Sequence, residues 1–164
     1  MYFGKKAEIN FRLTLNGTAV EWTQEWNYLG VTLRQGKFFD CAVKNTVKKF
    51  YRALNAILRV EGRSDEMILL QLLESHCVPI LTYAIETIHV SNRDEKRSLR
   101  VAYNSIFRRL FGYRQFESVT ILQHAMGRQT WEELVDKKQL NFKMKMQFFA
   151  PDTLVSAVAR LHPT

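Results

Sequence analysis

The spacing of apolar residues changes near Asp40 from every second residue to about every 3.6 residues, which restricts the folds open to this chain. Before this point, apolar and polar residues alternate from Glu8 to Leu15, which predicts a strand with one buried face. After it, apolar residues recur at helical spacing, at Val43, Val47, Phe50, Leu54 and Leu58. The predicted fold class is therefore mainly α, with an N-terminal antiparallel β-hairpin and a third strand followed by a helical bundle.

The dipeptide Asn16-Gly17 predicts the turn of the hairpin, because a type I′ turn needs positive φ at both central residues. A two-residue turn fixes the register of the flanking strands. It pairs Leu15 with Thr18, Leu13 with Val20, Arg12 with Glu21 and Phe11 with Trp22. Renewed alternation predicts the third strand from Tyr28 to Leu33.

Capping residues and breakers predict the helices. One helix follows Asp40, a second begins after Ser64 as its cap, and a third begins after Asn92. Pro79 is expected to kink or divide the second helix. A capping box at Thr130–Glu133 opens another helix. The chain thus divides into a β unit (1–36), a helical region (37–149) and a C-terminal tail or short helix (150–164).

The composition favours a folded intracellular protein. The chain has 164 residues, of which 46% are hydrophobic. Its two cysteines, Cys41 and Cys77, suggest a reducing compartment, so we expect the cytoplasm or the nucleus. The N-terminus lacks the apolar stretch of a signal peptide. The most apolar run, Cys77 to Tyr83 with an extension to Ile88 that includes Glu86 and Thr87, is too short to cross a bilayer. We therefore expect no membrane partner.

The surplus of positive charge is arranged in rows. The formal net charge is +8, and the basic residues cluster in Lys44–Arg63 and in Arg93–Arg114. Because one residue turns a helix by about 100°, each row runs beside a core stripe. Phosphate backbones favour such rows, but a solvated helix face accounts for them about equally well on composition alone. Trp22 and Trp26 are suited to stacking on bases, although core placement at a sheet edge is favoured for them.

No motif points to catalysis. The adjacent carboxylates Asp65-Glu66, Asp94-Glu95 and Glu132-Glu133 each fall in the first turn of a predicted helix, where the helix dipole favours negative charge. The sequence has no zinc-ligand spacing, no phosphate-binding loop of the Walker type and no nucleophile elbow. We therefore predict no catalytic residue, no metal site and no cofactor.

Three sequence blocks follow one another in a specific order. They are Tyr28-Leu29-Gly30-Val31-Thr32-Leu33, the stretch from Cys77 to Glu86, and Leu99 to Gly112 with its Arg108-Arg109-Leu110-Phe111-Gly112 end. Together with the start Met1-Tyr2-Phe3-Gly4-Lys5, they resemble reverse transcriptases of non-LTR (LINE-type, jockey-like) retrotransposons. In that family the first block forms the primer grip and the others belong to a helical thumb. Ala84 stands where the family usually has glycine.

The resemblance implies a fragment without catalytic activity of its own. Residues 1–36 would be the end of the palm with the primer grip, and 37–149 a thumb-like domain. The family's catalytic aspartates would lie upstream, so RNA-directed DNA polymerase activity would need an attached palm. The implied partners are RNA, DNA or an RNA–DNA hybrid, bound without sequence preference. The expected nucleic-acid-binding residues are Tyr28, Gly30, Lys44, Lys48, Lys49, Arg52, Arg93, Arg97, Arg100 and Arg108.

Two other interpretations remain open. The chain can instead be a repurposed or orphan helical protein-interaction module with no nucleic-acid role. Its contact surface would then be apolar, with Phe38, Phe39, Phe148 and Phe149 as candidates. The remaining alternative is a product that folds and has no role.

Overall fold

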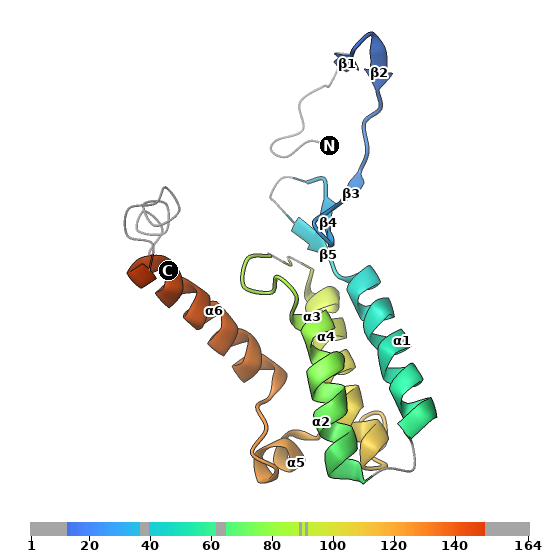
Figure 1. Ribbon diagram of the computed structural model, residues 1–164, viewed down its shortest axis with the longest axis vertical. Coiled ribbons are helices and arrows are strands. Elements are labelled where there is room, and N and C mark those ends of the chain that lie inside the picture. The colour runs from blue at the N-terminus through green and yellow to red at the C-terminus, as the bar shows by residue number, and fades with distance from the viewer. Residues whose placement is uncertain (1–12, 37–39, 62–64, 89, 91, 150–164) are drawn as a thin grey trace.

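The computed structural model describes residues 13–36, 40–61, 65–88, 90 and 92–149. Strands come first and helices follow, so the protein is mainly α with small antiparallel sheets at its N-terminus, as predicted (Figure 1). The strands are β1 (Leu13–Leu15), β2 (Thr18–Val20), β3 (Glu25–Tyr28), β4 (Val31–Arg34) and β5 (Asp40–Ala42). The helices are α1 (Lys44–Glu61), α2 (Glu66–His76), α3 (Val78–Thr82), α4 (Arg93–Leu110), α5 (Thr120–Ala125) and α6 (Trp131–Phe149).

The β1–β2 hairpin has the predicted turn and register. Asn16 and Gly17 both have positive φ, 50° and 78°, and Leu15 pairs with Thr18. The predicted partners Arg12 and Phe11 lie outside the described residues.

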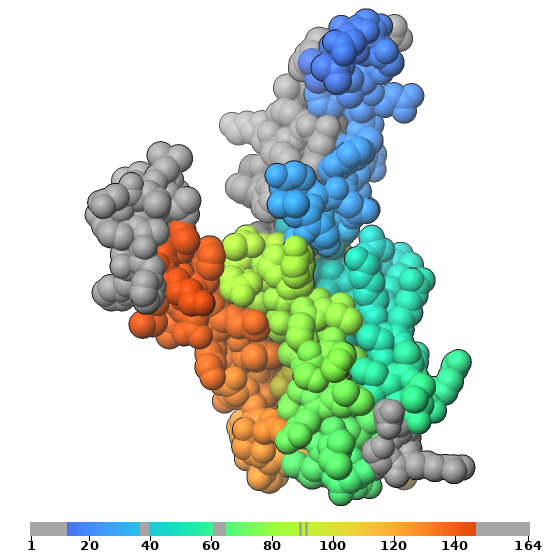
Figure 2. Space-filling view, in the orientation of Figure 1, coloured from blue at the N-terminus to red at the C-terminus, as the bar shows by residue number. Residues whose placement is uncertain are grey.

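The predicted burial of one hairpin face is wrong for the described residues. Leu13, Leu15 and Val20 are 46%, 69% and 47% exposed. The reason is that β1 and β2 form a separate two-stranded sheet, which lies at the end of the molecule away from the helices (Figures 1 and 2). Among the described residues, no second layer covers its apolar side chains.

The predicted single strand from Tyr28 to Leu33 is also wrong, because the segment is a second hairpin. Tyr28 ends β3 and Val31 begins β4, and the two strands pair across a two-residue turn. Leu29 and Gly30 in this turn have φ values of 46° and 80°. The alternation of Leu29, Val31 and Leu33 is therefore not that of one strand, since Leu29 lies in the turn. β5 adds to the other edge of β4, which gives the order β3-β4-β5.

The helical part is built around α1, α2 and α4. These helices lie side by side, with the α2–α3 segment running opposite to its two neighbours (Figure 1). Pro79 divides the predicted second helix, as expected, since α2 ends at His76 and α3 begins at Val78 with the proline in its first turn. Helix α6 slants away from the other helices.

Side-chain caps define the helix starts. Asp65 caps α2 by accepting the N–H groups of Met67 and Ile68, so Ser64, which lies outside the described residues, is not the cap. Asn92 caps α4, as predicted, by accepting the Asp94 N–H at 2.8 Å. All three predicted carboxylate pairs lie at helix starts, namely those of α2, α4 and α6.

The predicted capping box at α6 is complete. The Glu133 carboxylate accepts the Thr130 N–H at 2.8 Å, and the Thr130 hydroxyl accepts the Glu133 N–H at 3.3 Å. These bonds lower the pKa of Glu133.

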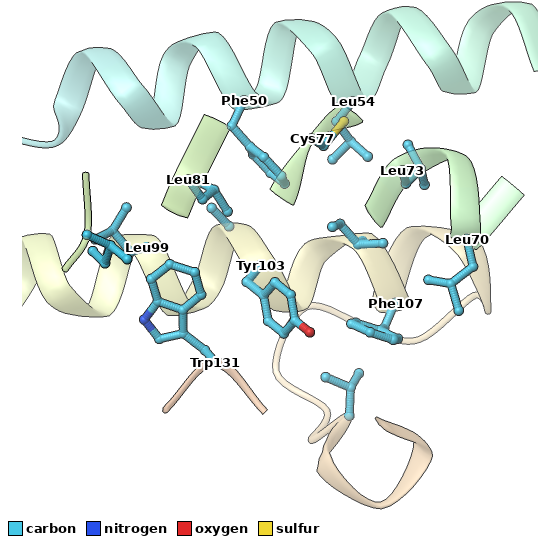
Figure 3. Close-up of a cluster of buried hydrophobic side chains, with 14 of the residues drawn as sticks. Phe50, Leu54, Leu70, Leu73, Cys77, Leu81, Leu99, Tyr103, Phe107 and Trp131 are labelled. Carbon is cyan, nitrogen blue, oxygen red and sulfur yellow. The ribbon is translucent and has the colours of Figure 1, made fainter. Parts of the chain in front are cut away.

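One hydrophobic core joins the helices (Figure 3). Phe50 and Leu54 of α1 are fully buried, which confirms the predicted apolar stripe of this helix, and Phe107 of α4 is fully buried in the same core. Tyr103 packs against Trp131 with ring centroids 5.7 Å apart and donates its hydroxyl to the Gln129 carbonyl at 2.8 Å. Burial raises the pKa of Tyr103 to about 12. Trp131 thereby attaches the start of α6 to the core. Among the described residues, no helix is both long and apolar enough to span a bilayer.

Candidate nucleic-acid interface

The basic row of α1 is exposed along one side of the helix. Lys44, Lys48 and Arg52 project within about 80° of one another, since a helix turns by about 100° per residue. They lie on the side away from the buried Phe50 and Leu54. We call the set Lys44, Lys48, Lys49 and Arg52 the α1 row. Among the described residues, no carboxylate oxygen lies within 4.0 Å of a nitrogen of the α1 row.

The predicted residues of α4 lie on a second surface. Arg93, Arg97 and Arg100 are exposed and line a groove of about 610 Å³ between α4 and α6. The groove has an apolar floor that includes Trp131, and carboxylates on its α6 side. One of these carboxylates, Glu132, lies 3.5 Å from Arg100. The groove is therefore only partly suited to an anion.

Arg108 lies nearer the other end of α4. Its Nε donates to the Glu117 carbonyl at 3.1 Å. Together with Arg97 and Arg100 it lines a second hollow, between α4 and the segment 115–132, whose lining also includes Glu117 and Glu132. The structure thus keeps the predicted residues of α4 on one helix face.

Arg109 connects the surfaces of α1 and α4. Its guanidinium carbon lies 5.5 Å from the centre of the Tyr51 ring, and it donates a hydrogen bond to the Asn55 side chain. Asn55 projects between Lys44 and Lys48 in the helical projection of α1. Sequence reasoning counted Arg109 within the basic cluster Arg93–Arg114 but did not include it in the site. The helical period gave no signal of its contact with α1, because the contact joins residues 54 positions apart.

The two predicted residues of the β part have different surroundings. The Tyr28 side chain is 60% exposed and shares a face of β3 with Trp26, which is 59% exposed rather than in the core. Gly30 lies against the Tyr83 ring, so that a Cβ there would be 3.3 Å from Cε1. The Tyr83 hydroxyl donates to the Leu29 carbonyl at 3.0 Å. Turn geometry and this packing therefore account for the glycine.

A charged cluster that sequence reasoning missed joins the sheet to the helices. Arg34 of β4 contacts Glu95 of α4 at 2.7 Å, Asp40 of β5 at 3.3 Å and Glu25 of β3 at 3.4 Å. The hydrogen bond from Arg34 to Glu95 raises the pKa of the guanidinium. Glu95 therefore contacts the sheet instead of completing a capping box with Asn92. This cluster fixes the orientation of β3–β5 relative to α4.

The remaining titratable residues do not gather into a reactive centre in the part of the chain that the structure describes. No three His, Cys, Asp or Glu side chains there converge in a way that would hold a metal ion. Cys77 is fully buried, and burial raises the pKa of its thiol to about 11. The thiol therefore stays protonated at neutral pH. The adjacent His76 is exposed, with its Nδ1 2.9 Å from the Ser75 hydroxyl.

Comparisons of the chain with protein-family models, with curated proteins and with solved structures give no match.

Proposed function

We propose that the chain binds the sugar–phosphate backbone of a nucleic-acid duplex, an RNA–DNA hybrid foremost, through the α1 row. This is the role that its resemblance to LINE-type reverse transcriptases implies for a thumb-like region. The observation that carries the proposal is the exposed α1 row, whose charges have no carboxylate within 4.0 Å among the described residues. No catalytic step is proposed for the chain alone, and polymerisation would require an attached palm.

The geometry of the α1 row suits a duplex backbone. Lys44, Lys48 and Arg52 follow one another at about 6 Å along the helix axis, so several phosphates can be contacted at once. Each neutralised phosphate releases condensed counterions, which makes the affinity depend steeply on salt. Contacts to phosphate and sugar carry no sequence information, so binding should be insensitive to sequence. Arg93, Arg97, Arg100 and Arg108 would extend the contact along α4.

The experiment is a salt titration of binding to a fluorescently labelled RNA–DNA hybrid. The triple variant Lys44→Ala, Lys48→Ala and Arg52→Ala should weaken binding equally for different sequences. It should also reduce the slope of log affinity against log salt by about three. A triple variant of three exposed basic residues elsewhere, Arg114→Ala, Lys137→Ala and Lys145→Ala, is the charge-matched control. A slope near zero for the native chain, or equal losses in both triple variants, contradicts the proposal.

A second candidate function is favoured by the exposed apolar side chains of the β part. Leu13, Leu15 and Val20 of the β1–β2 hairpin are each at least 46% exposed. Such a surface is typical of a protein-interaction site. The predicted contact residues Phe38 and Phe39 lie outside the described residues, and the side chains of Phe148 and Phe149 are not described. Sedimentation should show self-association that Leu15→Lys reduces, and a native monomer at high concentration contradicts this candidate.

A further inference from the structure

We propose that a second site, at the junction of α1 with the C-terminal end of α4, binds an unpaired base together with its phosphate. A hollow of about 510 Å³ lies there, which is in the usual range for small-molecule sites. Its lining includes Tyr51, Ser105, Arg108, Arg109, Tyr113 and Gln115. We call it the seam pocket. This inference goes beyond the proposed duplex binding, because a paired base offers no free ring face.

Among the described residues, no ion pair with a carboxylate neutralises the positive charge of the seam pocket. Arg108 donates to a main-chain carbonyl, that of Glu117, and Arg109 donates to the side-chain oxygen of Asn55 and lies over the Tyr51 ring. These neighbours orient both guanidinium groups but are themselves uncharged. No carboxylate is among the residues that line the pocket. Two oriented guanidinium groups without a counter-charge are suited to a phosphate.

Three other arginines, unlike Arg108 and Arg109, form ion pairs with carboxylates. Arg34, Arg100 and Arg128 each lie within 3.5 Å of a carboxylate oxygen. The dipole of α4 favours basic residues in its last turn and so accounts in part for Arg108 and Arg109. It does not account for the aromatic rings and neutral acceptors gathered around them. The combination therefore points to an anionic aromatic ligand.

Tyr113 is placed to stack on a base. Just beyond the end of α4, Gly112 has a φ of +70°, and the Tyr113 N–H donates to the Arg108 carbonyl at 2.9 Å. This arrangement fixes the tyrosine just beyond the two arginines while its side chain remains 39% exposed. Stacking of bases on such rings tolerates any base. Ser105 and Gln115 add a hydroxyl and an amide that can bind the edge of the base.

The test is the binding of a fluorescently labelled single-stranded oligoadenylate to the full chain, with adenosine monophosphate, adenosine and inorganic phosphate as competitors. Adenosine monophosphate should displace the strand at concentrations at least tenfold lower than adenosine or phosphate. If none of the three competitors displaces the strand but strand binding still depends on the pocket residues, the site takes a nucleotide within a strand rather than a free one. Adenosine competing as well as its monophosphate overturns the proposal, since the arginines would then have no role.

Variants test the same site independently. Tyr113→Ser and Arg109→Gln should each weaken binding of the strand about tenfold. Arg114→Gln removes the same charge one residue beyond Tyr113, outside the pocket lining, and should leave binding nearly unchanged. Equal effects of Tyr113→Ser and Arg114→Gln overturn the proposal. The triple variant of the α1 row should retain this binding, so failure of the duplex proposal and failure of this one are distinguishable.

Discussion

At the scale of single residues, Arg34 is the side chain on which the junction between sheet and helices most depends. Replacing it by glutamine removes the charge opposite Glu95, whose side chain is only 17% exposed. We expect Arg34→Gln to lower the free energy of unfolding by about 1–3 kcal/mol, because a largely buried carboxylate loses its charged partner. Urea denaturation followed by circular dichroism measures this change.

The matched control is Glu25→Gln. Glu25 is the most exposed partner of Arg34, at 54%, and its contact is the longest, at 3.4 Å. Exposed pairs contribute little, so this variant should cost less than about 1 kcal/mol. Equal losses in the two variants would show that Arg34 does not stabilise the protein through Glu95.

Residue-scale features were predictable where they depend on near neighbours in the sequence. The turn at Asn16-Gly17 and the capping box of Thr130 with Glu133 involve residues at most three positions apart, and both are confirmed. The contact between Arg34 and Glu95 joins residues 61 positions apart. Nothing in the local pattern distinguishes Glu95 from an ordinary first-turn carboxylate. Such long-range ion pairs emerge only from the packing of whole elements.

At the scale of elements, the turn between β3 and β4 fixes how the sheet meets the loop after α3. Gly30→Ala introduces a Cβ at positive φ and 3.3 Å from the Tyr83 ring. We expect a loss of about 1–2 kcal/mol in the free energy of unfolding. Thermal and urea unfolding measure it. The loss should shrink when Gly30→Ala is combined with Tyr83→Ser, because the smaller side chain leaves room for the added methyl group.

Gly17→Ala is the control for Gly30→Ala. Gly17 has nearly the same φ, +78°, but no atom lies within 4 Å of its would-be Cβ. Its hairpin is a separate sheet, so strain in this turn should hardly alter global unfolding. Similar losses in both variants would contradict this local confinement and would show that the positive φ is sufficient to explain the Gly30 result without the contact with Tyr83.

Helices were easier to predict than strands in this chain. The stripe around Phe50 and Leu54 repeats over several turns, and the core confirms it. The segment Tyr28–Leu33 offered only a few alternating residues, and its turn contains Leu29, a residue that rarely adopts positive φ. The basic positions of the candidate site followed from the helical period. The seam pocket did not, because it requires the distance between α1 and α4 and the direction of Tyr113 beyond the helix end.

At the scale of the whole molecule, stability is unevenly distributed. The helices share one buried core, whereas the described residues of β1 and β2 are all exposed and pair only with each other. An isolated two-stranded hairpin is at best marginally stable in water. We therefore expect hydrogen exchange to show weak protection in β1–β2 and protection close to the global unfolding free energy at Phe50, Leu54 and Ile106.

The same measurement separates the two candidate functions, because each protects a different surface. Binding of an RNA–DNA hybrid should slow exchange in α1 and leave the β1–β2 hairpin unchanged, because α1 carries the α1 row and the described residues of the hairpin include no basic side chain. Self-association through the hairpin should instead slow exchange around Leu15 and Val20 as the protein concentration rises. Uniformly strong protection of the hairpin in dilute protein would contradict the expected weakness of β1–β2. The hybrid should no longer protect α1 in the triple variant of Lys44, Lys48 and Arg52. If this protection persists, the duplex binds to other residues.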